Sequence, residues 1–194
     1  MHSRRSAPIF ATLLTAVSLM TGCRIGKNDL GNYSNVKVAT PFGGLLVKTN
    51  DTTAVPGLGL PDYPGAELQL AQSDSGATEV NLSLGSLHLR INTASYKSAD
   101  SPDKLIAFYR QALSRYGEVI ECQDGLPVGT SSRTPEGLTC DKEKSADFYS
   151  DNPNQILLKA GFKQHQHLVA INPDSAGTKL QIVAVDLPGH HLFW

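Results

Sequence analysis

The stretch VNLSLGSLHLRI, residues 80–91, alternates apolar and polar side chains on both sides of Gly85-Ser86. A glycine in the first central position suits a two-residue type II′ turn, because that position needs a positive φ. Such a turn pairs Leu84 with Leu87, Leu82 with Leu89, and Val80 with Ile91. All six apolar side chains then lie on one face, whereas a slip of one residue would move one strand's apolar side chains to the other face. The stretch therefore predicts an antiparallel β-hairpin with one apolar face.

Residues 101–116 predict an α-helix. Ser101 is a suitable N-cap, Pro102 fits the first turn, and Asp103 complements the positive N-terminal end of the helix dipole. Gly117 is suited to end the helix. The apolar positions recur at helical spacing and are expected to face a core; they are Leu105, Phe108, Tyr109, Ala112, Leu113 and Tyr116.

The second half of the chain predicts further strands rather than a second long helix. Those strands cover residues 118–122, 138–141, 155–163, 167–172 and 179–187. The last is apolar on both faces, so we expect it to be central or covered on both sides. Without helical crossovers the pairing should be antiparallel. We expect an α+β domain over residues 66–194, an antiparallel β-sheet with one main helix on a face.

The chain before this domain predicts a smaller unit. Residues 36–50 alternate around Gly43-Gly44 and predict a small N-terminal β-hairpin, in which a Gly-Gly turn pairs Phe42 with Leu45. Residues 51–65 contain three prolines and three glycines, which indicates a linker or a loop over the domain surface.

The N-terminus has the organisation of a secretory signal. Arg4 and Arg5 form a basic start, and residues 7–20 form an uncharged, mostly apolar run. That run is shorter than the about 20 residues of a membrane-spanning helix. It ends in Leu19-Met20-Thr21-Gly22-Cys23, which resembles the lipobox of a bacterial lipoprotein. An uncleaved anchor and an ordinary signal peptide cut elsewhere are the alternatives.

The lipoprotein resemblance implies a signal peptide over residues 1–22 and a diacylglyceryl group on the sulfur of Cys23. The protein would then be attached to a membrane of the bacterial envelope, facing out of the cytoplasm. Arg24, rather than Asp, follows the cysteine, which favours the outer membrane where the cell has one. Residues 23–35 are then the lipidated cysteine and a polar, flexible tether.

Composition restricts the partners and the cysteine chemistry. Removal of residues 1–22 leaves 15 basic and 18 acidic residues with no basic block, so we expect no nucleic-acid partner. With Cys23 lipidated, Cys122 and Cys140 remain as a pair in an oxidising compartment, which favours a disulfide. Closing a loop of this length stabilises the fold by about 3 kcal/mol.

Signals for catalysis or metal binding are sparse. His165 and His167 would lie on one side of a strand and could begin a metal site. A third ligand would have to come from His88 or from the pair His190-His191, and solvated surface histidines are the alternative. The chain contains no Gly-x-Ser-x-Gly and no paired carboxylates on one element, so we expect neither a catalytic residue nor a cofactor.

A second resemblance concerns the mature domain. Tyr63-Pro64-Gly65-Ala66, then a hairpin, then Phe108-Tyr109-x-x-x-Leu113-x-x-x-Gly117 resembles a group of bacterial envelope proteins with no assigned activity, over about residues 60–190. We expect a non-catalytic, lipid-anchored protein that binds or positions another envelope component. The alternatives are an envelope hydrolase or metal-dependent enzyme, and a carrier of a small apolar ligand held between helix 101–116 and the sheet.

Overall fold

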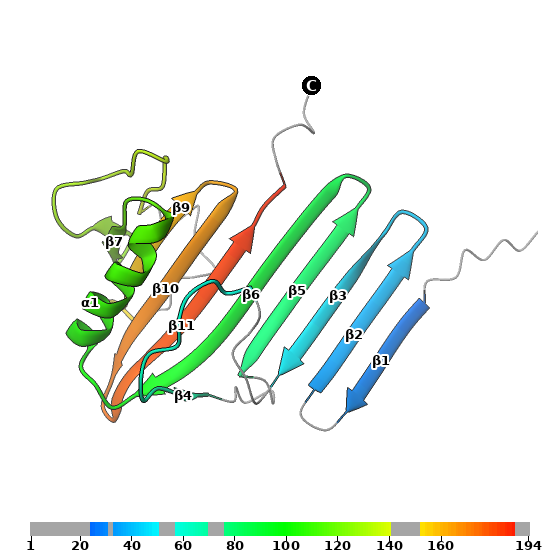
Figure 1. Cartoon of the computed structure of the whole chain (residues 1–194), viewed down its shortest axis with the longest axis horizontal. Coiled ribbons are helices and arrows are strands. Elements are labelled where there is room, and N and C mark those ends of the chain that lie inside the picture. Colours follow the sequence, from blue (N-terminus) through cyan, green and yellow to red (C-terminus); the bar gives the residue numbers. More distant parts are fainter. Residues whose placement is uncertain (1–23, 31–32, 51–56, 70–75, 141–151, 189–194) are drawn as a thin grey trace, which may run out of the picture.

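The fold is an open β-sheet with one α-helix, and every strand pair that the structure describes is antiparallel (Figure 1). A computed structural model describes residues 24–30, 33–50, 57–69, 76–140 and 152–188. The elements are β1 (Arg24–Leu30), β2 (Tyr33–Thr40), β3 (Gly43–Asn50), β4 (Glu67–Leu68), β5 (Ala77–Leu84), β6 (Leu87–Ser98), α1 (Pro102–Leu113), a 3-10 turn (Ser114–Tyr116), β7 (Ile120–Gln123), β8 (Leu126–Pro127), β9 (Ile156–Phe162), β10 (His165–Asp174) and β11 (Gly177–Asp186). The strand order is β1-β2-β3-β5-β6-β11-β10-β9-β7-β8, and β4 pairs with β6.

The hairpin predicted from residues 80–91 is confirmed, with its register. In β5 and β6, Leu84 pairs with Leu87, Leu82 with Leu89 and Val80 with Ile91. Gly85 has φ +58°, the positive value that the turn requires. The prediction that the last strand is central is confirmed as well. This strand, β11, lies between β6 and β10 and has buried side chains on both faces.

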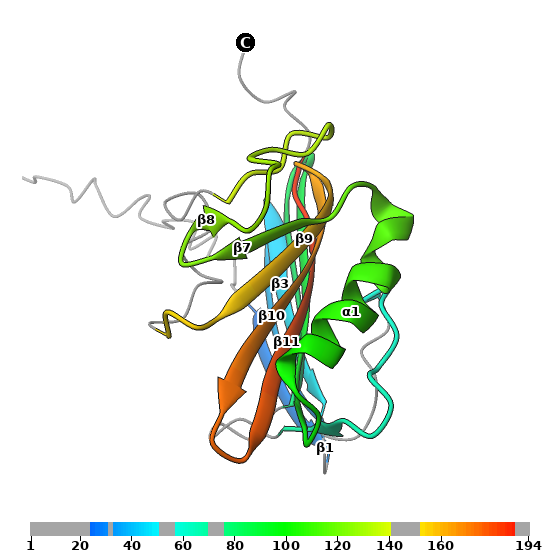
Figure 2. The same cartoon turned by 90° about the vertical axis from the view of Figure 1, so that its left-hand side faces the viewer.

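Helix α1 packs on one side of the sheet, against β9 and β10, and we call that side the helix face (Figure 2). Leu105, Tyr109 and Leu113 are completely buried there. The Ser101 side chain makes no capping hydrogen bond. Its carbonyl oxygen instead accepts from the backbone N–H of Lys104, at 3.2 Å. Residues 57–65, predicted as a linker or surface loop, cross the same face and bury two leucines in the helix-face core.

The opposite side, the loop face, is covered over β9, β10 and β11 by the chain between β7 and residue 140 (Figure 2). Cys122 and Cys140 form a disulfide within this cover, with Cα atoms 5.4 Å apart. Residues 138–140, expected to begin a strand over 138–141, make only an isolated bridge between Thr139 and Arg133. The loop-face core consists of Ile120, Cys122, Leu138, Cys140, Leu157, Leu168, Ala170, Val183 and Val185.

The hairpin predicted at residues 36–50 forms, but its expected register is wrong. Pro41-Phe42 makes the turn, so that Thr40 pairs with Gly43. Each residue of β2 pairs with a residue four positions earlier in β3 than the expected register gave. Because four is an even number, the same side chains remain on each face of the sheet. A Cβ on Gly43 would lie 1.9 Å from the carbonyl oxygen of Ser83. The glycine is therefore needed for the close approach of β5 and not for the turn.

The prediction of a flexible tether over residues 23–35 is wrong for most of that segment. Residues 24–30 form β1, and each of them pairs with a residue of β2. The hairpin is also not a separate unit, because β3 pairs with β5 from Gly43 to Asn50. Backbone pairing to an existing sheet edge holds β1, which needs no alternation of apolar side chains. Cys23 lies outside the described residues.

Candidate functional site

Two rows of apolar side chains cross four adjacent strands on the loop face. One row runs from Val38 through Leu45 and Leu82 to Leu89, and the other from Val36 through Val47 and Val80 to Ile91. We call these eight residues the open apolar face. All eight are partly exposed. At the usual spacing between strands, each row is about 14 Å wide.

The open apolar face continues the loop-face core, and no element that the structure describes covers it. Ile91 pairs with Val185, which is buried beneath the chain that carries the disulfide. Among the described elements, β1, β2, β3 and β5 make extensive contacts only with their sheet neighbours. The apolar surface therefore extends beyond the part that this protein's described residues cover.

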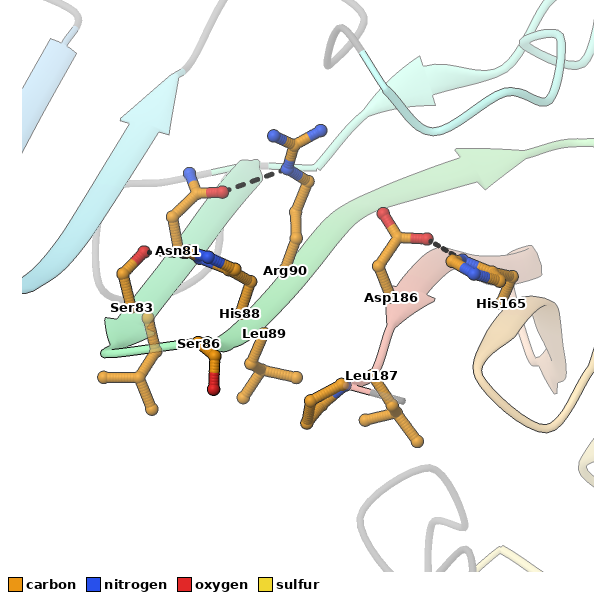
Figure 3. A pocket seen from close by; sticks show the side chains of 11 residues that line it. Asn81, Ser83, Ser86, His88, Leu89, Arg90, His165, Asp186 and Leu187 are labelled. Carbon is orange, nitrogen blue, oxygen red and sulfur yellow. Dashed lines mark hydrogen bonds and ion pairs between the residues drawn. The ribbon is translucent and has the colours of Figure 1, made fainter. Parts of the chain in front are cut away.

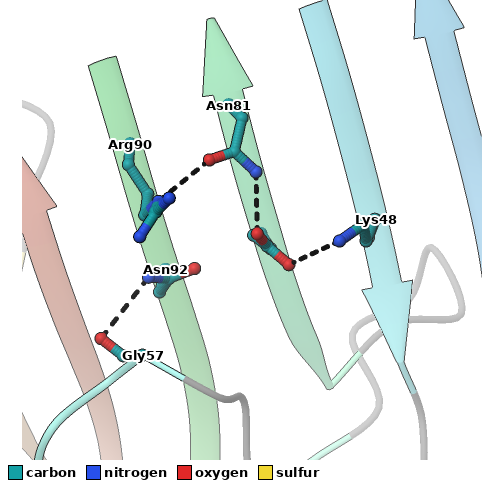
Figure 4. Close-up of polar contacts among 6 residues, drawn as sticks. Lys48, Gly57, Asn81, Arg90 and Asn92 are labelled. Carbon is teal, nitrogen blue, oxygen red and sulfur yellow. Dashed lines mark hydrogen bonds and ion pairs between the residues drawn. The ribbon is translucent and has the colours of Figure 1, made fainter. Parts of the chain in front are cut away.

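The other side of the same strands is polar (Figure 4). Lys48 pairs with Glu79 at 3.2 Å, Asn81 donates to Glu79 at 2.7 Å, and Arg90 donates to Asn81 at 3.0 Å. The hydrogen bond from Asn81, together with Lys48, lowers the pKa of Glu79 below its usual value. The side-chain amide of Asn92, on the same side, donates to the carbonyl oxygen of Gly57 at 3.4 Å. This half of the sheet is therefore suited to water on one side and to an apolar surface on the other.

His165 and His167 lie on the same side of β10, as predicted, but in different surroundings. His165 is exposed, and its Nδ1 lies 2.8 Å from a carboxylate oxygen of Asp186. His167 stacks on the ring of Tyr116, with centroids 3.7 Å apart. Burial lowers the pKa of His167, and the nearby Arg115 acts in the same direction. The imidazole of His167 is therefore a neutral packing group at physiological pH.

The histidines do not converge with other metal ligands in the described part of the chain. No group of three or more His, Cys, Asp or Glu side chains there could hold a metal ion. The Nδ1 of His88 lies 3.2 Å from the hydroxyl of Ser83, away from the His165–Asp186 pair. His190 and His191 lie outside the described residues.

A notch of about 510 Å³ separates the ends of β6 and β11 (Figure 3). His88, Arg90 and Asp186 point to one side of the strands, whereas Leu89 and Leu187 point to the other. The serine–histidine pair and the histidine–aspartate pair at this notch share no member. The notch thus joins a polar and an apolar surface and assembles no catalytic triad from the residues that line it.

A second pocket, of about 320 Å³, is lined by Arg133, Lys159 and Lys163. Lys159 is fully buried, and its ammonium donates to the carbonyl oxygen of Thr139 at 3.1 Å. The sequence gives no sign that Lys159 is buried, because a lysine among the apolar residues of a strand ordinarily points to solvent. Its hydrogen bond to the loop that carries the disulfide indicates a structural role.

The interface between α1 and the sheet is filled by side chains. Tyr63, Phe108 and Tyr109 form an aromatic cluster there, with Phe108 and Tyr109 centroids 5.0 Å apart. Tyr109 is fully buried, and burial raises the pKa of its hydroxyl. Leu105, Tyr109 and Leu113, the buried side chains of α1, are each 0% exposed, so they contact protein atoms rather than solvent.

The sequence predicted the two hairpins that form the open apolar face, and it predicted one apolar side for the hairpin at residues 80–91. It did not predict that β3 and β5 are neighbours, because 26 residues separate them. No described helix is long and apolar enough to cross a membrane. Comparisons with protein-family models, with curated proteins and with solved structures gave no match.

Proposed function

We propose that this chain is a non-catalytic, lipid-anchored protein of the bacterial envelope, which binds another envelope protein through the open apolar face. The observation that carries the proposal is the continuous apolar surface across β2, β3, β5 and β6, with a polar surface on the other side of the same strands. The lipobox-like run that ends at Cys23 supports attachment to a membrane.

The chemistry of the face defines the partner. Large exposed apolar patches on soluble domains mark interaction sites, since each apolar side chain gains free energy when it leaves water. The eight side chains are aliphatic and carry no charge, so the partner should present an apolar surface without buried polar groups. The rows lie on regular strands, which gives a rigid and nearly preformed surface.

A photo-cross-linking experiment in cells tests this proposal. Val47 and Lys48 are neighbours on β3 that point to opposite faces, so the photoreactive substitution Val47→p-benzoylphenylalanine has a matched control at Lys48. We expect an adduct with one envelope protein, identified by mass spectrometry, from position 47 only. Adding Leu82→Glu should abolish it, because Leu82 lies in the adjacent row of the same face.

Other outcomes contradict the proposal. Equal adducts from both positions would show that the open apolar face has no special role. An adduct of the chain with itself would assign the face to a second copy. Adducts with lipid alone would favour the carrier of apolar ligands instead.

The anchor has a separate test. Cys23→Ser should leave the precursor unprocessed and without the mass of an attached diacylglyceryl group, because the thiol is the group that the lipid would modify. Normal processing and membrane attachment of this variant would refute the lipid anchor.

A further inference from the structure

Five large apolar side chains are exposed at one end of the sheet. They are Ile25, Phe42, Leu84, Phe162 and Leu187, and they come from separate strands and turns. Phe42 and Ile25 are the most exposed, at 83% and 73%. The other two exposed large apolar residues that the structure describes, Leu126 and Val128, lie in and beside β8 at the lateral edge of the sheet.

The strand register places these five residues at the same end of the sheet, spread across its width. A single row of paired residues crosses eight strands, and it consists of Gly26, Lys37, Leu46, Asn81, Arg90, Asp186, His165 and Phe162. Phe162 lies on this row, and Ile25 and Leu187 lie one residue beyond it on the same side. The Phe42 turn and Leu84 lie further out in that direction. This end is the upper one in Figure 1, and we call it the sheet tip.

The chain enters the fold at the sheet tip. Arg24 is the first residue of β1 and pairs with Ala39, close to the Phe42 turn. Cys23 is bonded to Arg24, so their Cα atoms are about 3.8 Å apart. A lipid on Cys23 would therefore hold this end of the sheet, rather than the opposite one, near the membrane.

We propose that the sheet tip lies in the interfacial region of the membrane that holds the Cys23 lipid, with the Phe42 turn and Leu84 inserted among the headgroups. This proposal rests on the lipid anchor of the proposed function. Apolar side chains bind this region by leaving water, typically reaching about 5–10 Å into the boundary between headgroups and acyl chains. The exposed Lys163 follows Phe162 in the sequence and supplies a cation suited to lipid phosphates.

This orientation stands the sheet on its end. The strands would rise from the membrane, and the open apolar face would point sideways, where a partner protein can reach it. The lipid chains already hold the protein on the membrane, so the sheet tip contributes orientation more than attachment.

Depth-dependent fluorescence quenching tests the proposal on the full lipidated chain. Trp194, the single tryptophan, is first replaced by Phe. Phe42→Trp then reports from the tip, and Leu126→Trp, at a position that is 69% exposed, is the matched control. Both proteins are reconstituted into vesicles of phosphatidylethanolamine and phosphatidylglycerol with brominated acyl chains. We expect the emission of the Phe42→Trp protein to fall by about half and shift to the blue, and that of the control to stay unchanged.

The possible results distinguish a failure of the proposed orientation from a failure of the lipid anchor. A protein that floats with the vesicles but shows no quenching in the Phe42→Trp variant overturns the proposed orientation and leaves the anchor intact. Equal quenching at both positions also overturns it. A chain that does not float with the vesicles refutes the anchor and the tip together. The emission of Leu84→Trp should be quenched as that of Phe42→Trp is. This second position shows whether quenching is a property of the sheet tip or of the Phe42 turn alone.

Discussion

Loss of the disulfide should destabilise the protein by an amount that the structure allows us to estimate. Cys122 and Cys140 are 18 residues apart, and closing a loop of this length contributes about 3 kcal/mol to the free energy of unfolding. Both cysteines are buried in the loop-face core, so Cys122→Ala with Cys140→Ala also removes packing worth about 1 kcal/mol. The total of about 4 kcal/mol corresponds to a fall in Tm of roughly 10 °C for a domain of this size.

Urea unfolding followed by far-ultraviolet circular dichroism measures this loss. Reduction of the wild-type protein should cost about 3 kcal/mol, and the double variant should be indifferent to reductant. The chain that carries the disulfide covers Leu157 and Leu168, so we also expect the reduced protein to bind more of an apolar dye. A loss below about 1 kcal/mol in both proteins would refute the reasoning that this crosslink stabilises the cover.

Three further predictions concern single positions. Gly43→Ala should cost more than about 2 kcal/mol in urea unfolding, because its Cβ meets the carbonyl oxygen of Ser83, whereas Gly26→Ala, with open space around it, should stay within about 0.5 kcal/mol. Leu158→Ala should cost about 2–5 kcal/mol, since Leu158 is fully buried in the helix-face core, and a smaller change would indicate that the interface collapses around the cavity. The lowered pKa of His167 means that the unfolded chain binds more protons, so stability should fall as the pH drops below about 6.5. His167→Gln should reduce that dependence, measured as the free energy of unfolding at pH 5.5 and 7.5, and an unchanged slope would assign it to other groups.

The local parts of the fold follow from the sequence where one physical rule dominates. The register of β5 and β6 is fixed by alternation together with a glycine turn, and α1 by spacing and by Pro102. The position of β11 inside the sheet follows from its apolar residues on both faces. In each case the residues that decide the structure are close in the sequence.

The remaining parts depend on contacts between distant residues. The polar strand β1 is held by the edge of β2, and Gly43 is required by Ser83, 40 residues away. The apolar side of the hairpin at residues 80–91 could be predicted, but not its continuation onto β2 and β3, because the pairing of β3 with β5 spans a connection rich in proline and glycine. Lys159 is buried through a hydrogen bond to Thr139 that no sequence pattern specifies.

The strand order also constrains how the chain folds. From β1 to β6, apart from the short β4, each strand pairs with the one before it, so this half can form in step with the order of the sequence. The pairing of β6 with β11 joins Ser98 to Thr178 and Arg90 to Asp186, and must wait until almost the whole chain is present. Contacts so distant in sequence form slowly. If the chain crosses a membrane from its N-terminus, its sheet is complete only after β11 has emerged, although β1 to β6 can pair before then.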